Sequence, residues 1–255
     1  MCDIIASFRS IDEPEPTLLV VGDLDFTAVC AFKESATSLL EKHQSIVVDL
    51  SRAPFVDSSG VRTLVEIYHQ AVDMGKHLQL RGINSSTQKS LQISGFAGLF
   101  GMDSLRLEAA DSRICAKHEL KQADWRISES VVVGRPVLVA SLREYAAEAA
   151  REAGLSEPII SDVKLAVGEA LANALKHAVQ PGRDKIRLRL MSCHSALVVE
   201  VTDQGPGFDP DADRAPAPEA LQSGGLGIHL MRSVMDEVDF FFDEQGSKVR
   251  MLKWV

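Results

Sequence analysis

Two patterns of apolar segments along the 255-residue chain constrain its fold more than any other feature. In the first half, short runs rich in Val, Ile and Leu alternate with helical stretches, which is typical of an α/β layer fold. The expected strands are 17–25, 46–50 and 78–83, and the expected helices are 27–42, 61–72 and 85–95. The middle helix carries its apolar side chains on one face, at Val61, Leu64, Val65, Tyr68 and Val72.

The second half groups its helices and strands instead of alternating them strictly. Its expected strands are 126–134, 185–191 and 196–203, followed by a closing hairpin of 238–243 and 248–255. Its expected helices run from Pro136 to Gly154, from Glu157 to Val179 and from 225 to 236. A polar segment at 117–124 separates the halves. We therefore expect two α/β domains, 1–116 and 125–255.

Composition restricts the partners and the location of the protein. The net charge of −9 argues against binding to nucleic acid or to an anionic membrane surface, because both need clustered Lys and Arg. The four cysteines lie far apart without zinc-ligand spacing, so reduced thiols are expected. The first 16 residues lack the basic and apolar parts of a signal peptide. We expect a cytoplasmic protein whose partners are proteins or small molecules.

Three polar segments of the second half suggest a nucleotide site. Glu169, Asn173 and His177 are spaced to share one helix face, where a carboxylate and a carboxamide suit a general base and a hard cation. The sequence 203-DQGPG-207 ends a strand, and its glycines allow a tight turn close to a ligand. The glycines of 224-GGLG-227 open a helix, where free backbone N–H groups bind phosphate.

Each of these segments also has an ordinary structural interpretation. The stripe could be a solvated helix face, and the glycines could form plain turns. Their order, with the Gly/Pro/Asp-rich loop 204–224 between them, is much harder to obtain by accident. Together the three segments predict ATP binding.

Residues 125–255 resemble the GHKL (Bergerat) ATPase superfamily and, within it, the anti-sigma-factor serine kinases of bacterial partner-switching systems. The match is carried by 163-VKLAVGEALANALKHA-178 and 225-GLGIHLMRSVMDEVDF-240. The resemblance implies that Glu169 accepts the substrate proton, that Asn173 holds Mg²⁺ and that Asp203 binds the adenine amino group of ATP. It assigns the shaping of the pocket and lid to Gly205, Gly207, Gly225 and Gly227. Relatives often have an adenine-binding Thr in the last hairpin, where this chain has Gly246-Ser247-Lys248.

The sequence 54-PFVDSSGVRTL-64 places Asp57 and Ser58 at the start of a helix. Either residue could act as an ordinary N-cap that binds free backbone N–H groups. A serine at a helix N-terminus is also well placed to carry a phosphate, because the helix dipole favours the added negative charge. The position alone leaves both interpretations open.

Residues 3–110 resemble the STAS domain of anti-sigma-factor antagonists. The resemblance rests on 22-GDLD-25, 47-VVDLSRAPFVDSSGVRTLV-65 and 94-SGF-96, and it implies that Ser58 is the phosphoacceptor. In such systems the kinase and the antagonist are separate chains, whereas here they share one. Phosphorylation of Ser58 in cis, phosphorylation in trans and a vestigial serine therefore all stay open.

These resemblances predict a partner-switching regulator with an ATP-dependent serine kinase domain, working with a sigma factor, a STAS protein or a phosphatase. The short linker suggests that one domain cannot reach its own active site, which favours transfer between the chains of a homodimer. The alternative is a nucleotide-gated protein-binding switch without significant kinase activity. A histidine-kinase fragment with His118 as phosphoacceptor has little support, because the surrounding sequence lacks a long dimerisation helix.

Overall fold

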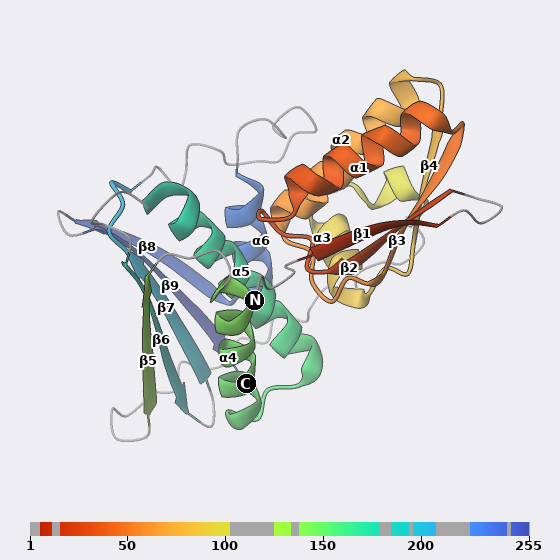
Figure 1. Cartoon of the computed structure of the whole chain (residues 1–255). Coiled ribbons are helices and arrows are strands. Elements are labelled where there is room, and N and C mark those ends of the chain that lie inside the picture. Colours follow the sequence, from red (N-terminus) through yellow and green to blue (C-terminus); the bar gives the residue numbers. More distant parts are fainter. Residues whose placement is uncertain are drawn as a thin grey trace.

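The computed structural model describes residues 6–11, 16–102, 125–133, 138–178, 185–193, 196–207, 225–243 and 246–254. Figure 1 shows two lobes in chain order, an N-terminal domain in red to yellow and a C-terminal domain in green to blue. The expected boundary at 117–124, the loop 208–224 and His118 lie outside the described residues. In the described part of the chain, no helix is both long and apolar enough to cross a membrane.

The N-terminal domain has a four-stranded sheet in the order β1-β2-β3-β4. The strands are β1 (Ala6–Ile11), β2 (Thr17–Gly22), β3 (Ser45–Arg52) and β4 (His77–Arg81). Strands β2, β3 and β4 are parallel, with Leu18 opposite Val48 and Ile46 opposite Leu78, as expected for a buried β-branched strand such as β3. Sequence analysis missed β1, which pairs antiparallel with β2 and whose sequence, ASFRSI, has a single β-branched residue and so gives little strand signal.

Helices α1 (Val29–Lys42) and α2 (Ser58–Asp73) pack on each other and on this sheet. They are followed by α3 (Ser85–Ile93) and a 3₁₀ turn at Ala97–Phe100. The apolar face predicted for α2 is buried at Val61, Leu64 and Val65. The assignment of Val72 to that face is wrong: its side chain is 54% exposed, because the core in the last turn is reached by Ala71 instead.

The C-terminal domain has a five-stranded antiparallel sheet in the order β5-β6-β7-β9-β8. Its strands are β5 (Arg126–Val133), β6 (Lys185–Cys193), β7 (Ala196–Asp203), β8 (Glu237–Asp243) and β9 (Gly246–Trp254). Its helices are α4 (Leu138–Glu152), α5 (Glu157–Ala178) and α6 (Leu226–Val234), which gather on one face of the sheet (Figure 1). The expected helix start at Pro136 and the expected helix end at Val179 lie outside the described residues.

Helix α5 lies between the sheet of its own domain and the N-terminal domain. It packs on α4, α6 and β7, and it also contacts α3 across the domain boundary. Almost every residue from Ile160 to Leu175 is buried or half-buried. A helix that is apolar on nearly all sides is expected to be covered on nearly all sides, and the N-terminal domain supplies the second cover.

Candidate functional site

The carboxylate of Glu169 on α5 meets Ser58, the first residue of α2, across the domain boundary. The Ser58 hydroxyl donates to Glu169 Oε2 at 2.6 Å, and the Ser58 backbone N–H donates to Oε1 at 2.6 Å. The two residues are only 1% and 3% exposed. The structure therefore brings together the residue expected to be the base and the hydroxyl expected to be the phosphoacceptor.

Asp57 holds Ser58 in this position by capping α2. One carboxylate oxygen of Asp57 accepts from the Gly60 N–H at 2.8 Å, and the other accepts from the Phe26 N–H at 3.0 Å. The N-cap interpretation is thus confirmed for Asp57. Ser58 is left at the open end of the helix, so its N–H and its hydroxyl both point to an acceptor outside the helix.

Burial raises the pKa of both carboxyl groups of this site, Glu169 and Asp57. Burial, and then the negative charge of Asp57, raises the pKa of Glu169 to about 7, while the hydrogen bonds from Ser58 and the charge of Lys176 act in the opposite direction. Burial likewise raises the pKa of Asp57. Because a general base works best when its pKa is near the working pH, Glu169 can take up a proton at neutral pH.

Lys176 is a member of the site that sequence analysis did not single out. It follows Glu169 by two helical turns, and its Nζ donates to the hydroxyl of Ser59 at 2.8 Å. Its ammonium group also lies 5.5 Å from the centre of the Phe26 ring. The spacing of seven residues from Glu169 could have indicated a shared helix face.

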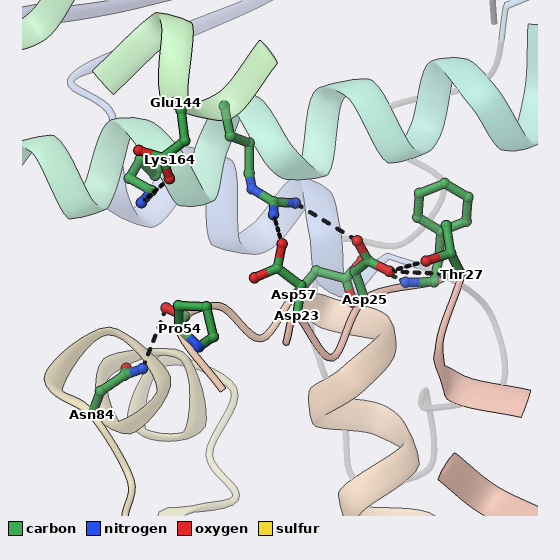
Figure 2. A network of polar contacts seen from close by, with 10 residues as sticks. Asp23, Asp25, Thr27, Pro54, Asp57, Asn84, Glu144 and Lys164 are labelled. Atoms are coloured by element: carbon green, nitrogen blue, oxygen red, sulfur yellow. Dashed lines mark hydrogen bonds and ion pairs between the residues drawn. The ribbon is translucent and has the colours of Figure 1, made fainter. Parts of the chain in front are cut away.

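A second polar cluster joins the domains beside the serine. The buried Arg143 of α4 forms ion pairs with Asp23 and, at 3.8 Å, with Asp25. Figure 2 shows Asp23, Asp25 and Asp57 gathered between the start of α2 and the helices of the C-terminal domain. Both partners of Arg143 belong to the 22-GDLD-25 segment, which sequence analysis used for the resemblance without giving it a contact.

Only some of the residues expected to bind the nucleotide line a common pocket, which lies in the C-terminal domain. Asn173 of α5 lines a small cleft, partly open to solvent, with Asp203, Gly205 and Gly207. The Gly205 N–H donates to Asp203 Oδ1 at 2.7 Å, which closes the turn after β7. Ser247 of β9 also lines this cleft, at the place where the sequence departs from the threonine of relatives.

The two glycines of α6 lie outside the lining of that cleft. Gly225 is the N-cap of α6, and Gly227 packs on the Ser58–Glu169 pair. A methyl carbon at Gly227 would lie 2.6 Å from Glu169 Oε2 and 3.4 Å from Ser58 Oγ. The structure therefore shows Gly227 giving room to the carboxylate, a contact that sequence analysis did not foresee.

The expectation that the linker keeps each domain from its own active site is wrong for this structure. Ser58 and Glu169 of the same chain are in hydrogen-bond contact, and Lys89 of α3 adds an interdomain ion pair to Asp162 of α5 at 2.6 Å. Charged groups at both ends of the boundary thus favour docking within one chain.

Comparisons with known proteins agree with this division. Residues 132–253 match the family model of the histidine kinase-like ATPase domain, and residues 11–110 match that of the STAS domain. The serine-protein kinase RsbW of Listeria monocytogenes is 35% identical over 115 residues, covering 42% of this chain and 73% of the relative. RsbW of Staphylococcus epidermidis is 34% identical over 113 residues, covering 40% and 70%.

Among solved structures, an anti-sigma factor antagonist from Mycobacterium paratuberculosis is 18% identical with a TM-score of 0.34, covering 38% of this chain and 83% of that one. The chain thus joins a STAS domain to a histidine kinase-like ATPase domain, the domain pair of a partner-switching regulator. It belongs to the family of the serine-protein kinase RsbW.

Proposed function

We propose that this protein is an ATP-dependent serine kinase that phosphorylates Ser58 of its own STAS domain. The observation that carries the proposal is the direct hydrogen bond from the Ser58 hydroxyl to the buried carboxylate of Glu169. The contact lies within one chain, so the substrate is already beside the base before any second molecule binds.

In the proposed reaction, Ser58 Oγ attacks the γ-phosphorus of ATP while Glu169 Oε2 takes the hydroxyl proton. The new O–P bond forms as the bond from the γ-phosphorus to the β-phosphate oxygen breaks, and ADP leaves. Glu169 Oε1 keeps the Ser58 N–H, so the serine stays in place during the transfer. Burial of the pair excludes water, which would otherwise compete for the phosphoryl group.

We assign nucleotide binding to the cleft beside α5. Asp203 would accept from the adenine amino group, with Ser247 beside it, and Gly205 and Gly207 would shape the turn around the base. Gly225 and Gly227 open α6, where free N–H groups favour phosphate.

Asn173 is our candidate ligand for Mg²⁺. Within the described residues, no group of three or more His, Cys, Asp or Glu side chains could hold a metal by itself. Mg²⁺ commonly uses one or two protein oxygens and completes its shell with phosphate oxygens and water, so a single carboxamide at the cleft fits. The ion would offset charge on the phosphates during transfer.

The partners of the protein are proteins, by its membership of this family. We propose a sigma factor, a further STAS protein or a phosphatase as the specific partners, and a homodimer as the assembly. Each would have to bind a chain whose kinase face is already covered by its own STAS domain.

The test is incubation of the purified protein with Mg²⁺ and γ-labelled ATP, followed by mass spectrometry of the phosphopeptide. We expect label on Ser58 that is lost in Ser58→Ala and in Glu169→Gln. Ser35→Ala, which removes an exposed hydroxyl in the same domain, should keep the label. A labelled wild type beside an unlabelled mixture of Ser58→Ala and Glu169→Gln would establish transfer within one chain.

Binding of ATP without any label on Ser58 would contradict the proposal. That result would favour a nucleotide-gated binding switch instead. Label in a mixture of Ser58→Ala and Glu169→Gln, neither of which is labelled alone, would show that transfer occurs between chains.

A further inference from the structure

Phe55 of the STAS domain packs into the core of the ATPase domain. It precedes Ser58 by three residues and is 4% exposed. It belongs to the same buried apolar cluster as residues of the other domain, among them Val139, Leu142 and Ala146 of α4. An aromatic side chain contributes a large apolar area to an interface, so Phe55 is the main apolar anchor of this docked arrangement.

Gly168 makes the space that the Phe55 ring occupies. It lies in the interior of α5, directly before Glu169. A methyl carbon at Gly168 would lie 2.7 Å from Phe55 Cζ and 3.0 Å from Arg143 Cδ. Glycine is less favourable than alanine inside a helix, and the φ angle of Gly168 is not positive, so the local backbone does not require it. The ring does.

Arg143 closes this notch from the other side. Its guanidinium carbon lies 3.8 Å from the centre of the Phe55 ring, within the range of a cation–π contact. Among the described residues, its Nε and Nη1 atoms have no hydrogen-bond acceptor, although Nη1 lies 3.8 Å from an Asp25 carboxylate oxygen. The same guanidinium pairs with Asp23, so one side chain binds both the ring and the acidic segment.

We propose that the kinase selects its substrate by an aromatic residue three positions before the phosphoacceptor serine, seated in the notch formed by Gly168 and Arg143. This inference rests on the proposed function and names its substrate class: STAS segments with an aromatic side chain at the position of Phe55. Gly168 and Glu169 are consecutive, so the residue that admits the ring is joined to the residue that binds the serine. Seating the ring therefore sets the position of the Ser58 hydroxyl on the carboxylate.

The experiment compares Gly168→Ala, Phe55→Ala and the double variant in the full chain, with two measurements. The first is hydrogen exchange of the Ser58 amide, which is bonded to Glu169 and so reports docking without any catalysis. The second is the initial rate of Ser58 phosphorylation. We expect Gly168→Ala to speed exchange and to slow phosphorylation at least ten-fold each. In the Phe55→Ala background, where there is no ring to displace, the added methyl should change neither measurement by more than two-fold.

Phe55→Leu combined with Gly168→Ala provides a rescue, because the smaller side chain leaves room for the methyl. We expect this double variant to phosphorylate Ser58 at least three-fold faster than Gly168→Ala alone. Affinity for a fluorescent ATP analogue and the unfolding temperature check that the ATPase domain stays folded, since alanine is the better helix former. Wild-type exchange and rate in Gly168→Ala would overturn the proposal. If Gly168→Ala alters the exchange of the Ser58 amide but the wild-type protein never labels Ser58, the proposed kinase activity is refuted. The seating of Phe55 in the notch is then still supported.

Discussion

At the scale of single residues, the site depends on a carboxylate that is buried yet hydrogen-bonded to a serine of the other domain. Glu169 has two oxygens, and both accept from the same serine. Burial would by itself favour the neutral acid, and the charge of Asp57 adds to this effect. The Ser58 donors and Lys176 favour the carboxylate, and the balance leaves the pKa of Glu169 near neutrality.

The rate of Ser58 phosphorylation should therefore rise with pH and level off above about 7, because only the ionised carboxylate of Glu169 can accept the proton. Lys176→Met removes a positive charge that lowers this pKa, so its profile should move to higher pH, and Lys176→Arg should move it back. Initial rates in buffers of constant ionic strength from pH 5.5 to 9 would measure both. Identical profiles for wild type and Lys176→Met would show that Lys176 has no electrostatic influence on the base.

The same pKa has an opposite consequence for stability. A carboxyl group whose pKa is raised by folding stabilises the folded state below its ordinary pKa. That contribution is lost as the pH rises through the folded-state value. The pH range in which Glu169 is an effective base is thus the range in which its burial costs most.

At the scale of elements, three helix segments meet at one point. The start of α2 presents Ser58, α5 presents Glu169, and α6 approaches both at Gly227. Helix α6 contacts α2 and α3 of the STAS domain as well as α5 of its own domain. Because Gly227 of α6 packs directly on the Ser58–Glu169 pair, a shift of α6 would displace this pair.

Gly227→Ala should separate Ser58 from Glu169, since its methyl would lie 2.6 Å from the carboxylate oxygen. We expect at least a ten-fold loss in the rate of Ser58 phosphorylation, because a displacement of about 1 Å in a reacting pair can cost about a hundred-fold in rate. Single-turnover rates would measure it. Ser233→Ala, an exposed position on the same helix, is the matched control. A full rate in Gly227→Ala would show that α6 does not hold the pair.

At the scale of the whole molecule, the interface joins an apolar anchor to several ion pairs. Arg143 contacts Asp23, Asp25 and Phe55, while Lys89 pairs with Asp162 at a separate point of the boundary. Two contacts set apart in this way fix the orientation of one domain on the other. The docked chain resembles a kinase–substrate complex in which the two partners are covalently joined, which raises their effective concentration.

Arg143→Ala should weaken docking strongly, because breaking a buried ion pair costs about 3–5 kcal/mol when one partner is left behind. Arg151→Ala on the same helix is the control, because its ion pairs with Glu148 and Glu157 are exposed and solvent-screened and so contribute little to stability. Hydrogen exchange of the Ser58 amide with and without 1 M salt would compare them. Equal protection in the two variants would show that the buried pair does not hold the domains together.

The sequence by itself determined both domains and most helices and strands, which are carried by local signals such as periodic apolar residues, an N-cap and glycine-rich turns. Glu169 and Ser58 were singled out through the family resemblance of the segments that contain them. Strand β1 was not predicted, because its stability comes from pairing with β2 and is not indicated by its own residues.

Only the tertiary structure decided that Ser58 lies on the Glu169 of its own chain, and that Arg143, Lys176 and Gly168 serve the contact. The hydrogen bonds that join Ser58 to Glu169, Arg143 to Asp23 and Lys176 to Ser59 span 111, 120 and 117 positions of the sequence. Spacing along one helix or strand carries no information about such distant partners. The docked arrangement depends on shape and charge that exist only once both domains are folded.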